Sequence, residues 1–221
     1  MTVIVAFCSQ KGGVGKSTLA RALAAYMAGD GFSVRVVDLD MQQRTTERWA
    51  TRREASGVPL VPVEVVGCAN VSEALNDLGG VDVLIIDGYA RSSEGTLKMA
   101  QAADVVVQPT NGTEDDCEPA VLVFYDLYKA GIDPGRMLIA LSRLTTETEE
   151  RDGRAYFESA EIPIKVLDGA LYQKRAYGKA QDAGRSVLET DYDSLNDKAR
   201  SLLDALVSEI VAARKKAGVA A

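Results

Sequence analysis

The sequence contains no histidine among its 221 residues. This absence excludes a histidine general base, and it excludes metal sites that depend on imidazole ligands. The three cysteines, Cys8, Cys68 and Cys117, are odd in number and widely spaced. They therefore predict neither a disulfide framework nor a C-x-x-C metal site. They are consistent with a reducing cytoplasm, which is where we expect the protein to reside.

Long apolar runs are also absent from the sequence. None approaches the roughly 20 residues that a helix needs to cross a bilayer. The chain starts directly with strand-like residues, so we expect no secretion signal. The net charge is −7, whereas dedicated DNA-binding proteins are usually basic. Any nucleic acid would therefore have to be bound by a local basic patch against the field of the whole protein.

The sequence does contain a regular alternation of apolar, β-branched runs with helical patterns. We expect strands at residues 3–8, 34–37, 60–66, 81–86, 105–107, 137–141 and 162–167. We expect helices at residues 17–29, 45–54, 71–78, 95–102, 119–129, 154–160 and 195–214. This alternation predicts a single α/β domain over residues 1–221, with a twisted, mainly parallel sheet and helices on both faces. Residues 215–221 are expected to fray.

Residues 10–18, Gln-Lys-Gly-Gly-Val-Gly-Lys-Ser-Thr, lie between the first expected strand and the first expected helix. Strand, glycine-rich turn and helix form the setting of a phosphate-binding loop. The glycines let successive N–H groups point at an anion, and the helix N-terminus adds partial positive charge. Lys16 can reach the β- and γ-phosphates of a nucleotide, and the Ser17 hydroxyl can ligate Mg²⁺.

Three aspartates lie at the ends of expected strands. Asp38 and Asp40 can face the same way, with Leu39 in the core, because side chains alternate along a strand. Asp87 follows four apolar residues, the Walker B pattern in which the aspartate holds a Mg²⁺-bound water. Carboxyl ends of parallel strands gather at one edge, so one carboxylate could hold metal-bound water and another could orient the attacking water. The alternative to a metal or catalytic role is that Asp38 and Asp40 are solvated aspartates that cap the end of a strand.

The loop departs from the usual G-x4-G-K-[ST] pattern, because position 10 is glutamine and Lys11 follows it. Its form, K-G-G-x-G-K-[ST], resembles the deviant Walker A loop of the ParA/MinD family of ATPases. The resemblance implies a P-loop NTPase fold and an ATP-dependent homodimer in which Lys11 reaches the partner's phosphates. It implies that ATP is bound by Lys11, Gly12, Gly13, Val14, Gly15, Lys16, Ser17 and Thr18.

The same resemblance assigns the other roles. It implies that Lys11, Lys16 and Asp40 take part in catalysis, with Asp40 positioning the attacking water, and that Ser17, Asp38 and Asp87 hold Mg²⁺. Gln42 and Trp49 match the family, and the segment 172–187 is similar to the late segment of small ParA partition proteins. Three features depart from the family: Met41 replaces a proline, Gly88-Tyr89-Ala90 replaces a small residue with two prolines, and Ser142 replaces an asparagine near the base.

The implied function is a slow, Mg²⁺-dependent ATPase that dimerises on ATP, binds DNA without sequence preference and drives plasmid or chromosome partition. A ParB-like partner or adaptor would stimulate hydrolysis, and the protein would associate with the nucleoid. Candidate phosphate-directed DNA contacts are Lys174, Arg175, Lys179, Arg185, Lys198, Arg200, Arg214, Lys215 and Lys216. The alternative for these residues is an ordinary solvated charged surface.

Other outputs of the same chemistry stay open. A MinD-like membrane role would need a C-terminal helix with bulky apolar residues and basic flanks. Residues 195–214 carry Asp197, Asp204 and Glu209 on the other face and lack Trp and Phe, so we expect this helix to pack on the sheet. The sequence does not separate partition from positioning of another cargo or from conjugative transfer. A small-molecule kinase or ligase of the same fold is a further alternative.

Overall fold

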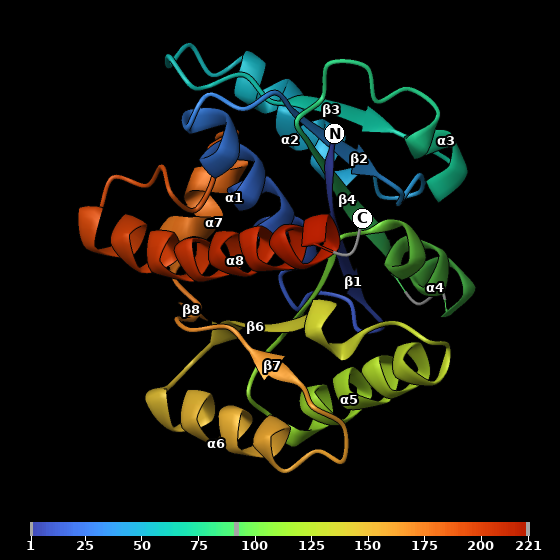
Figure 1. Ribbon diagram of the computed structural model, residues 1–221. Coiled ribbons are helices and arrows are strands. Elements are labelled where there is room, and N and C mark those ends of the chain that lie inside the picture. The colour runs from blue at the N-terminus through green and yellow to red at the C-terminus, as the bar shows by residue number, and fades with distance from the viewer. Residues whose placement is uncertain (1, 91–92, 220–221) are drawn as a thin grey trace.

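Eight strands form one sheet in the structure, a computed structural model that describes residues 2–90 and 93–219 (Figure 1). The strands are β1 (Val3–Ser9), β2 (Val34–Asp38), β3 (Glu64–Gly67), β4 (Val83–Ala90), β5 (Val105–Thr110), β6 (Met137–Leu144), β7 (Lys165–Val166) and β8 (Leu171–Tyr172). Their order is β3-β2-β4-β1-β5-β6-β7, with β8 beside β6. Every strand pairing among the described residues is parallel.

Helices cover both faces of this sheet (Figure 1). They are α1 (Lys16–Gly29), α2 (Thr45–Glu54), α3 (Val71–Leu75), α4 (Ser93–Ala102), α5 (Glu114–Lys129), α6 (Glu147–Glu158), α7 (Arg175–Asp182) and α8 (Asp193–Val219). Alternation along β1 divides the core: Val5 and Phe7 pack with α1, α2, α7 and α8, whereas Ala6 and Cys8 pack with α3 to α6. The prediction of a single α/β domain with a mainly parallel sheet and helices on both faces is confirmed.

The strand order places a crevice at the centre of the sheet. From β1 the chain crosses to β2 on one side, and from β4 it crosses over β1 to β5 on the other. Ligands in open parallel sheets bind outside the carboxyl ends of strands where the order reverses in this way. β1 and β4 are neighbours, so the residues that follow β1 and those that end β4 meet at this crevice.

Several elements differ from the sequence prediction. The expected strands 60–66 and 162–167 are confined to the shorter β3 and β7, since Pro62 and Pro163 cannot donate to a ladder. The sequence patterns predict neither α7, whose residues are largely polar, nor β8, which has only two residues. α8 continues to Val219, so residues 215–219 are helical, whereas fraying was the expectation; residues 220 and 221 lie outside the described residues.

α8 packs on the sheet, as its apolar spacing predicted. Ala199, Leu202, Leu206 and Ile210 are buried in the core beside α1. In the part of the chain that the structure describes, no helix combines the length and apolarity that crossing a bilayer requires.

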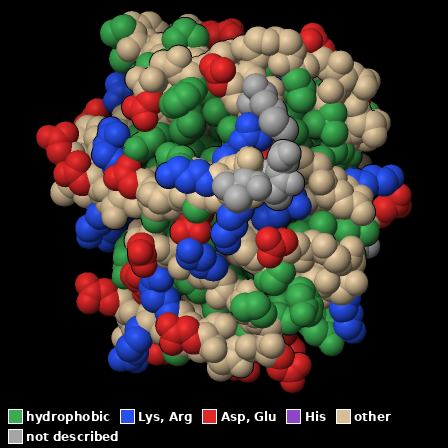
Figure 2. All heavy atoms as spheres, in the orientation of Figure 1, with side chains coloured by type: hydrophobic (Ala, Val, Ile, Leu, Met, Phe, Trp, Pro, Cys, Tyr) green, Lys and Arg blue, Asp and Glu red, His purple; other side chains and the backbone are tan. Residues whose placement is uncertain are grey.

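The basic residues considered as DNA contacts lie mainly on and around two helices of one face, α7 and α8. Figure 2 shows Lys and Arg side chains over and beside α8, with carboxylates between them. Some are engaged within the chain: Arg185 pairs with Asp191 at 2.8 Å and Arg214 with Asp104 at 3.3 Å. To bind a DNA phosphate, each of these two arginines would have to break its ion pair with a carboxylate.

Candidate functional site

The loop between β1 and α1 has the curled backbone that anion binding requires. Gly13 and Gly15 have φ angles of 82° and 104°, in the left-handed region that favours glycine. A Cβ at Gly15 would lie 2.5 Å from Ser142 Oγ, so a side chain there would also clash. Ser142 donates its hydroxyl hydrogen to the Val14 carbonyl, which anchors the loop to β6. The loop is therefore held in one shape by its own backbone and by a neighbouring strand.

Lys16 lies at the start of α1 and points to the end of β4. Its Nζ donates to Asp87 Oδ1 at 2.9 Å, and the two side chains are 13% and 1% exposed. The other carboxylate oxygen of Asp87 accepts the Thr46 hydroxyl at 2.7 Å. In the absence of a nucleotide, the lysine expected to bind phosphate thus neutralises the carboxylate expected to face Mg²⁺.

Asp38 and Asp87 are register partners on the neighbouring strands β2 and β4. Both oxygens of Asp38 accept backbone N–H groups, from Thr46 at 2.8 Å and from Asp40 at 3.0 Å. Burial raises the pKa of Asp38, and the nearby Asp87 carboxylate raises it further. Asp38 is therefore no solvated cap, and a cation brought to this pair would relieve the repulsion between the two carboxylates.

Asp40 follows β2 and is less buried than Asp38. Its Oδ1 accepts the Gln43 N–H at 3.0 Å, which shapes the turn into α2. Ser17 lies near this turn, because the Thr45 hydroxyl donates to Ser17 Oγ at 3.5 Å. Asp40, Lys16 and Ser17 line the same hollow. The structure thus brings the sequence-predicted phosphate, metal and water-positioning residues to one place.

The donor set suits Mg²⁺ bound together with a nucleotide. Among the described residues there is no group of three or more acidic or cysteine side chains that could cage a metal by itself. Mg²⁺ seldom uses such a cage, because it takes one or two protein oxygens, substrate phosphates and several waters. The Ser17 hydroxyl and the carboxylates of Asp38 and Asp87 supply oxygens of the required kind. These residues fit a metal that arrives with phosphates.

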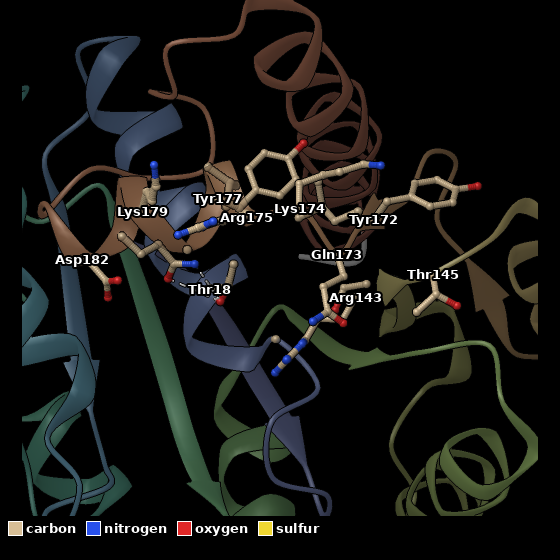
Figure 3. A pocket seen from close by; sticks show the side chains of 16 residues that line it. Thr18, Arg143, Thr145, Tyr172, Gln173, Lys174, Arg175, Tyr177, Lys179 and Asp182 are labelled. Atoms are coloured by element: carbon tan, nitrogen blue, oxygen red, sulfur yellow. Dashed lines mark hydrogen bonds between the residues drawn. The ribbon is translucent and has the colours of Figure 1, made fainter.

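Several hollows among the described residues border the loop, and two of them meet at Gly15 and Thr18. The first, of about 590 Å³, is lined by loop residues with Arg21, Asp40 and Thr45. The second is a groove of about 1040 Å³ that runs from Gly15 and Thr18 to α7 (Figure 3). Arg143 borders both, and its guanidinium donates to the Gly13 carbonyl. Together the hollows have the size of a nucleotide site, with phosphates in the first and a nucleoside in the second.

The groove wall contains three of the cations expected to contact DNA. Lys174, Arg175 and Lys179 line it together with Tyr172 and Gln173 (Figure 3). These three cations lie beside the loop, so a bound nucleotide and a DNA backbone would compete for them. Each cation would therefore contact either the nucleotide or the DNA. This placement could not be seen in the sequence, because α7 was not among the expected helices.

Lys11 borders the phosphate hollow of its own chain, but its side chain turns toward α5. Its ammonium pairs with Asp116 in the first turn of α5, and the Lys11 side chain is 43% exposed. The Lys11 N–H also donates to Ser9 Oγ at 3.1 Å, which fixes the backbone at the entrance of the loop. The Lys11 ammonium is open to water, but the Asp116 side chain is only 12% exposed, so Asp116 loses its cation in a largely buried place when Lys11 moves away.

Two of the three departures from the family pattern, Met41 and Gly88-Tyr89-Ala90, have consequences for the local backbone. Met41 is 45% exposed, and Arg44, three residues later, has a left-handed φ of 46° before α2 begins. β4 stays extended past Asp87 to Ala90, where the family has prolines. A Cβ at Gly88 would lie 2.5 Å from Met99 Cε and 2.6 Å from the Phe7 carbonyl, so this position requires glycine. Arg91 and Ser92, which follow, lie outside the described residues.

Sequence reasoning missed three polar residues that surround the site: Arg21, Thr46 and Gln181. Thr46 is fully buried between Asp38, Asp87 and Arg21. Gln181 belongs to α7 and contacts both Thr18 and Arg21. One signal was available: Arg21 interrupts the apolar run Leu19-Ala20-Arg21-Ala22-Leu23 at a position that a helix on the sheet must bury.

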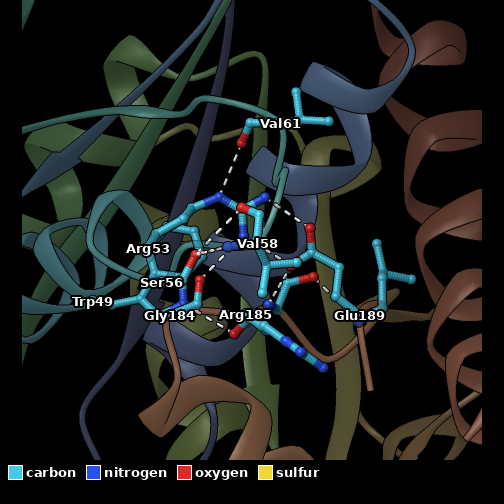
Figure 4. A network of polar contacts seen from close by, with 10 residues as sticks. Trp49, Arg53, Ser56, Val58, Val61, Gly184, Arg185 and Glu189 are labelled. Carbon is cyan, nitrogen blue, oxygen red and sulfur yellow. Dashed lines mark hydrogen bonds and ion pairs between the residues drawn. The ribbon is translucent and has the colours of Figure 1, made fainter. Parts of the chain in front are cut away.

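Trp49 is fully buried behind this site, and a network of polar contacts holds the chain around it (Figure 4). Its indole N–H donates to the Arg185 carbonyl at 3.0 Å, and the Arg53 guanidinium lies 5.2 Å from the ring centroid. Arg53 also bonds both oxygens of Glu189, at 2.7 and 2.8 Å, and the Gly184 carbonyl at 3.1 Å. The network joins α2 to the segment after α7.

Replacing Arg53 with methionine is expected to lower the free energy of unfolding by about 3 kcal/mol at pH 7, because a buried charge pair loses one partner. Burial alone would raise the pKa of Glu189, but hydrogen bonds from Arg53 and the Ser186 N–H outweigh it and lower that pKa. The stabilisation is therefore present above the unfolded-state pKa of about 4.3 and is lost as the pH falls through the folded-state value. Urea unfolding at several pH values measures this.

The exposed neighbour Arg52 provides the control for Arg53. Within residues 2–90 and 93–219 its guanidinium donates a hydrogen bond only to the Gln181 carbonyl, at 3.5 Å, so Arg52→Met should change stability by less than about 0.5 kcal/mol. Equal losses in Arg52→Met and Arg53→Met would contradict the role given to the Glu189 pair.

Comparisons with known proteins agree with this geometry. Residues 5–212 match the family model described as the CobQ/CobB/MinD/ParA nucleotide binding domain. The chain is 34% identical over 190 residues to the maintenance of carboxysome distribution protein A of Gloeobacter kilaueensis, covering 84% of each chain. It is 31% identical over 167 residues to the chromosome-partitioning ATPase Soj of Thermus thermophilus, covering 62% of this chain and 67% of Soj.

A solved structure shows the same fold. The septum site-determining protein MinD of Pyrococcus horikoshii, solved with Mg-ADP, has a TM-score of 0.69 at 18% identity, over 93% of this chain and 96% of MinD. The matched family model spans nearly all of the chain, and it includes the loop, the three aspartates and α7. The chain therefore belongs to the CobQ/CobB/MinD/ParA nucleotide-binding family.

Proposed function

We propose that this protein is an ATP-driven switch that dimerises when it binds ATP, binds DNA without sequence preference and serves DNA partition. The observation that carries the proposal is a loop with two lysines, Lys11 and Lys16, beside the carboxylates of Asp40 and Asp87. The similarity to Soj supports partition. The similarity to the carboxysome distribution protein supports a second candidate, the positioning of another cargo by the same chemistry.

ATP hydrolysis at this site would depend on positioning and charge neutralisation. Lys16 would leave Asp87 to bind the phosphates together with the loop N–H groups of residues 13–18. Mg²⁺, when bound through Ser17 and through waters on Asp38 and Asp87, would neutralise phosphate charge. Asp40 would orient the attacking water and accept its proton. We expect slow hydrolysis by the protein alone, with stimulation by a ParB-like partner or adaptor.

The DNA-binding part of the proposal is tested by co-sedimentation with random-sequence duplex DNA in ATP, ADP or no nucleotide, across a salt series. Binding with ATP alone, weakening steeply with salt, is expected. Lys198→Ala and Lys215→Ala should weaken it, whereas Lys129→Ala, which removes the same charge from the opposite face, should not. Absence of binding in every nucleotide state would reject DNA as the output and direct attention to another cargo.

Lys11→Ala is expected to bind ATP as a monomer. The lysine would contribute to phosphate binding only across the dimer, because in the single chain it pairs with Asp116. Size-exclusion chromatography with light scattering, in saturating ATP, measures the mass. Asp116→Asn is the matched control: it removes the same ion pair but keeps Lys11, so it should still form the dimer. An ATP dimer of Lys11→Ala as stable as that of the parent would reject the role across the dimer.

A further inference from the structure

Arg21 is a buried arginine that the proposed chemistry does not use. It lies on α1, one turn beyond Ser17, and is 7% exposed. Its neighbours along the helix, Ala20 and Ala22, are fully buried, and its guanidinium lies 5.8 Å from the Trp49 ring centroid. Burying a guanidinium is costly unless its N–H groups are all directed at partners. The partners of Arg21 therefore indicate why a charge is kept at this position.

One side of the guanidinium holds the carboxylates in place. Arg21 Nε donates to Thr46 Oγ1 at 3.1 Å. The Thr46 hydroxyl in turn donates to Asp87 Oδ2 at 2.7 Å, and the Thr46 N–H donates to Asp38 Oδ2 at 2.8 Å. Thr46 has no exposed surface, so its rotamer is set by these contacts. Through the Thr46 hydroxyl, Arg21 thus orients Asp87, whereas Asp38 is held by the backbone N–H of the same threonine.

The other side of the guanidinium reaches the groove. Arg21 Nη1 donates to Gln181 Oε1 at 3.1 Å, and Gln181 Nε2 donates to Thr18 Oγ1 at 3.2 Å. Gln181 and Thr18 both line the groove beside the loop (Figure 3 labels Thr18). A single side chain on α1 therefore connects α7, at the groove, with the start of α2, at the carboxylates.

We propose that Arg21 is a positioning residue that links the groove, through Gln181, to the metal-facing carboxylate of Asp87. Asp87 is held from two sides in this structure, by Lys16 and by Thr46. Phosphates draw Lys16 away from Asp87, and Thr46 then remains to hold the carboxylate. Because Arg21 fixes Thr46, it determines how strongly Mg²⁺ tightens the binding of a nucleotide. This inference rests on the proposed nucleotide site, and it adds a residue to it.

The test compares the affinity for ADP in Mg²⁺ with that in EDTA, by titration calorimetry of the full chain. ADP avoids hydrolysis, and the ratio of the two affinities isolates the metal-dependent part of binding. Arg21→Met should reduce this ratio about tenfold, because losing a side chain that orients a metal ligand typically lowers metal affinity by about 10- to 100-fold. Arg21→Lys keeps the charge but cannot donate to Thr46 and Gln181 together, so it should show a similar loss and serve if Arg21→Met does not fold.

A structural control separates positioning from stability. Arg136→Met removes another partly buried arginine, which bonds the Ala100 and Asp104 carbonyls at 2.9 and 3.2 Å just before β6, at the opposite edge of the sheet. It should lower the unfolding temperature and leave the Mg²⁺ ratio unchanged. Gln181→Leu should lower the ratio, and the double variant Arg21→Met/Gln181→Leu should be no worse than Arg21→Met, because the two act as one unit.

Each outcome has a distinct meaning. An unchanged ratio in both Arg21 variants would overturn the inference while the nucleotide site stands, and so would additive losses from Arg21→Met and Gln181→Leu. A parent chain that binds no ADP, or binds it equally in Mg²⁺ and EDTA, would overturn the proposed function and this inference with it. Equal weakening in Mg²⁺ and in EDTA leaves the ratio unchanged, so it would overturn the inference and give Arg21 a role in which the metal takes no part.

Discussion

Replacing Lys16 with alanine is expected to abolish nucleotide binding. Lys16 lines the phosphate hollow, and its side chain is only 13% exposed. Removing one partner of a desolvated charge contact typically costs about 3–5 kcal/mol, which lowers affinity by roughly a hundredfold to several thousandfold. Titration calorimetry with ADP or ATP in Mg²⁺ measures the loss directly.

The Lys16→Ala result needs a control, because the substitution also leaves the Asp87 carboxylate without its cation. Lys11→Ala removes a lysine from the same loop but not from this contact, so it should keep binding nucleotide. Circular dichroism establishes that Lys16→Ala is folded before binding is measured. Nucleotide affinity of folded Lys16→Ala equal to that of the parent would remove the phosphate role from Lys16.

Replacing Asp40 with alanine is expected to leave ATP binding intact and to lower hydrolysis by about 10²–10⁴-fold, the usual contribution of a general base. Asp40 borders the phosphate hollow but takes no part in the contacts between Lys16, Asp87 and Thr46. Its loss should therefore spare the phosphate cradle. Because the ATP state cannot be discharged, the variant should accumulate as a long-lived ATP dimer. Phosphate release over hours and the mass in ATP measure the two effects.

Asp40→Asn separates the chemistry of this residue from its place in the turn. Asparagine keeps an oxygen for the Gln43 N–H, a contact of 3.0 Å in the parent, but it cannot take a proton from water. If both variants lose hydrolysis equally, the carboxylate charge is the cause. Parent-like hydrolysis by Asp40→Ala would show that another group positions the water.

The residues of the phosphate loop could be predicted because their chemistry is contained in one short segment. The loop works through the backbone angles of Gly13 and Gly15 and through the side-chain reach of Lys16 and Ser17. Both are determined within nine consecutive residues. The end of β4 at an aspartate was also visible, since four apolar residues precede Asp87. The sequence did not show that β4 lies between β1 and β2, and this insertion brings Asp87 to both Lys16 and Asp38.

The rest of the site depends on contacts between distant segments. Arg21 and Gln181 are 160 positions apart, and α7 has too few apolar residues for its periodicity to predict a helix. The pairing of Lys11 with Asp116 depends in the same way on where α5 begins, five residues before the expected start at 119. Such contacts are set by the tertiary structure. The sequence signals them only through an unusual residue, such as an arginine within an apolar helical run.

The central claim is that ATP converts this chain from monomer to dimer through the loop of residues 11–18. Sedimentation velocity of the unmodified protein, in Mg²⁺ with ATP, with ADP and without nucleotide, tests it most directly. A monomer of 23.6 kDa is predicted without nucleotide and with ADP, and a species of twice that mass is predicted with ATP. The same sedimentation coefficient in all three conditions would contradict the claim.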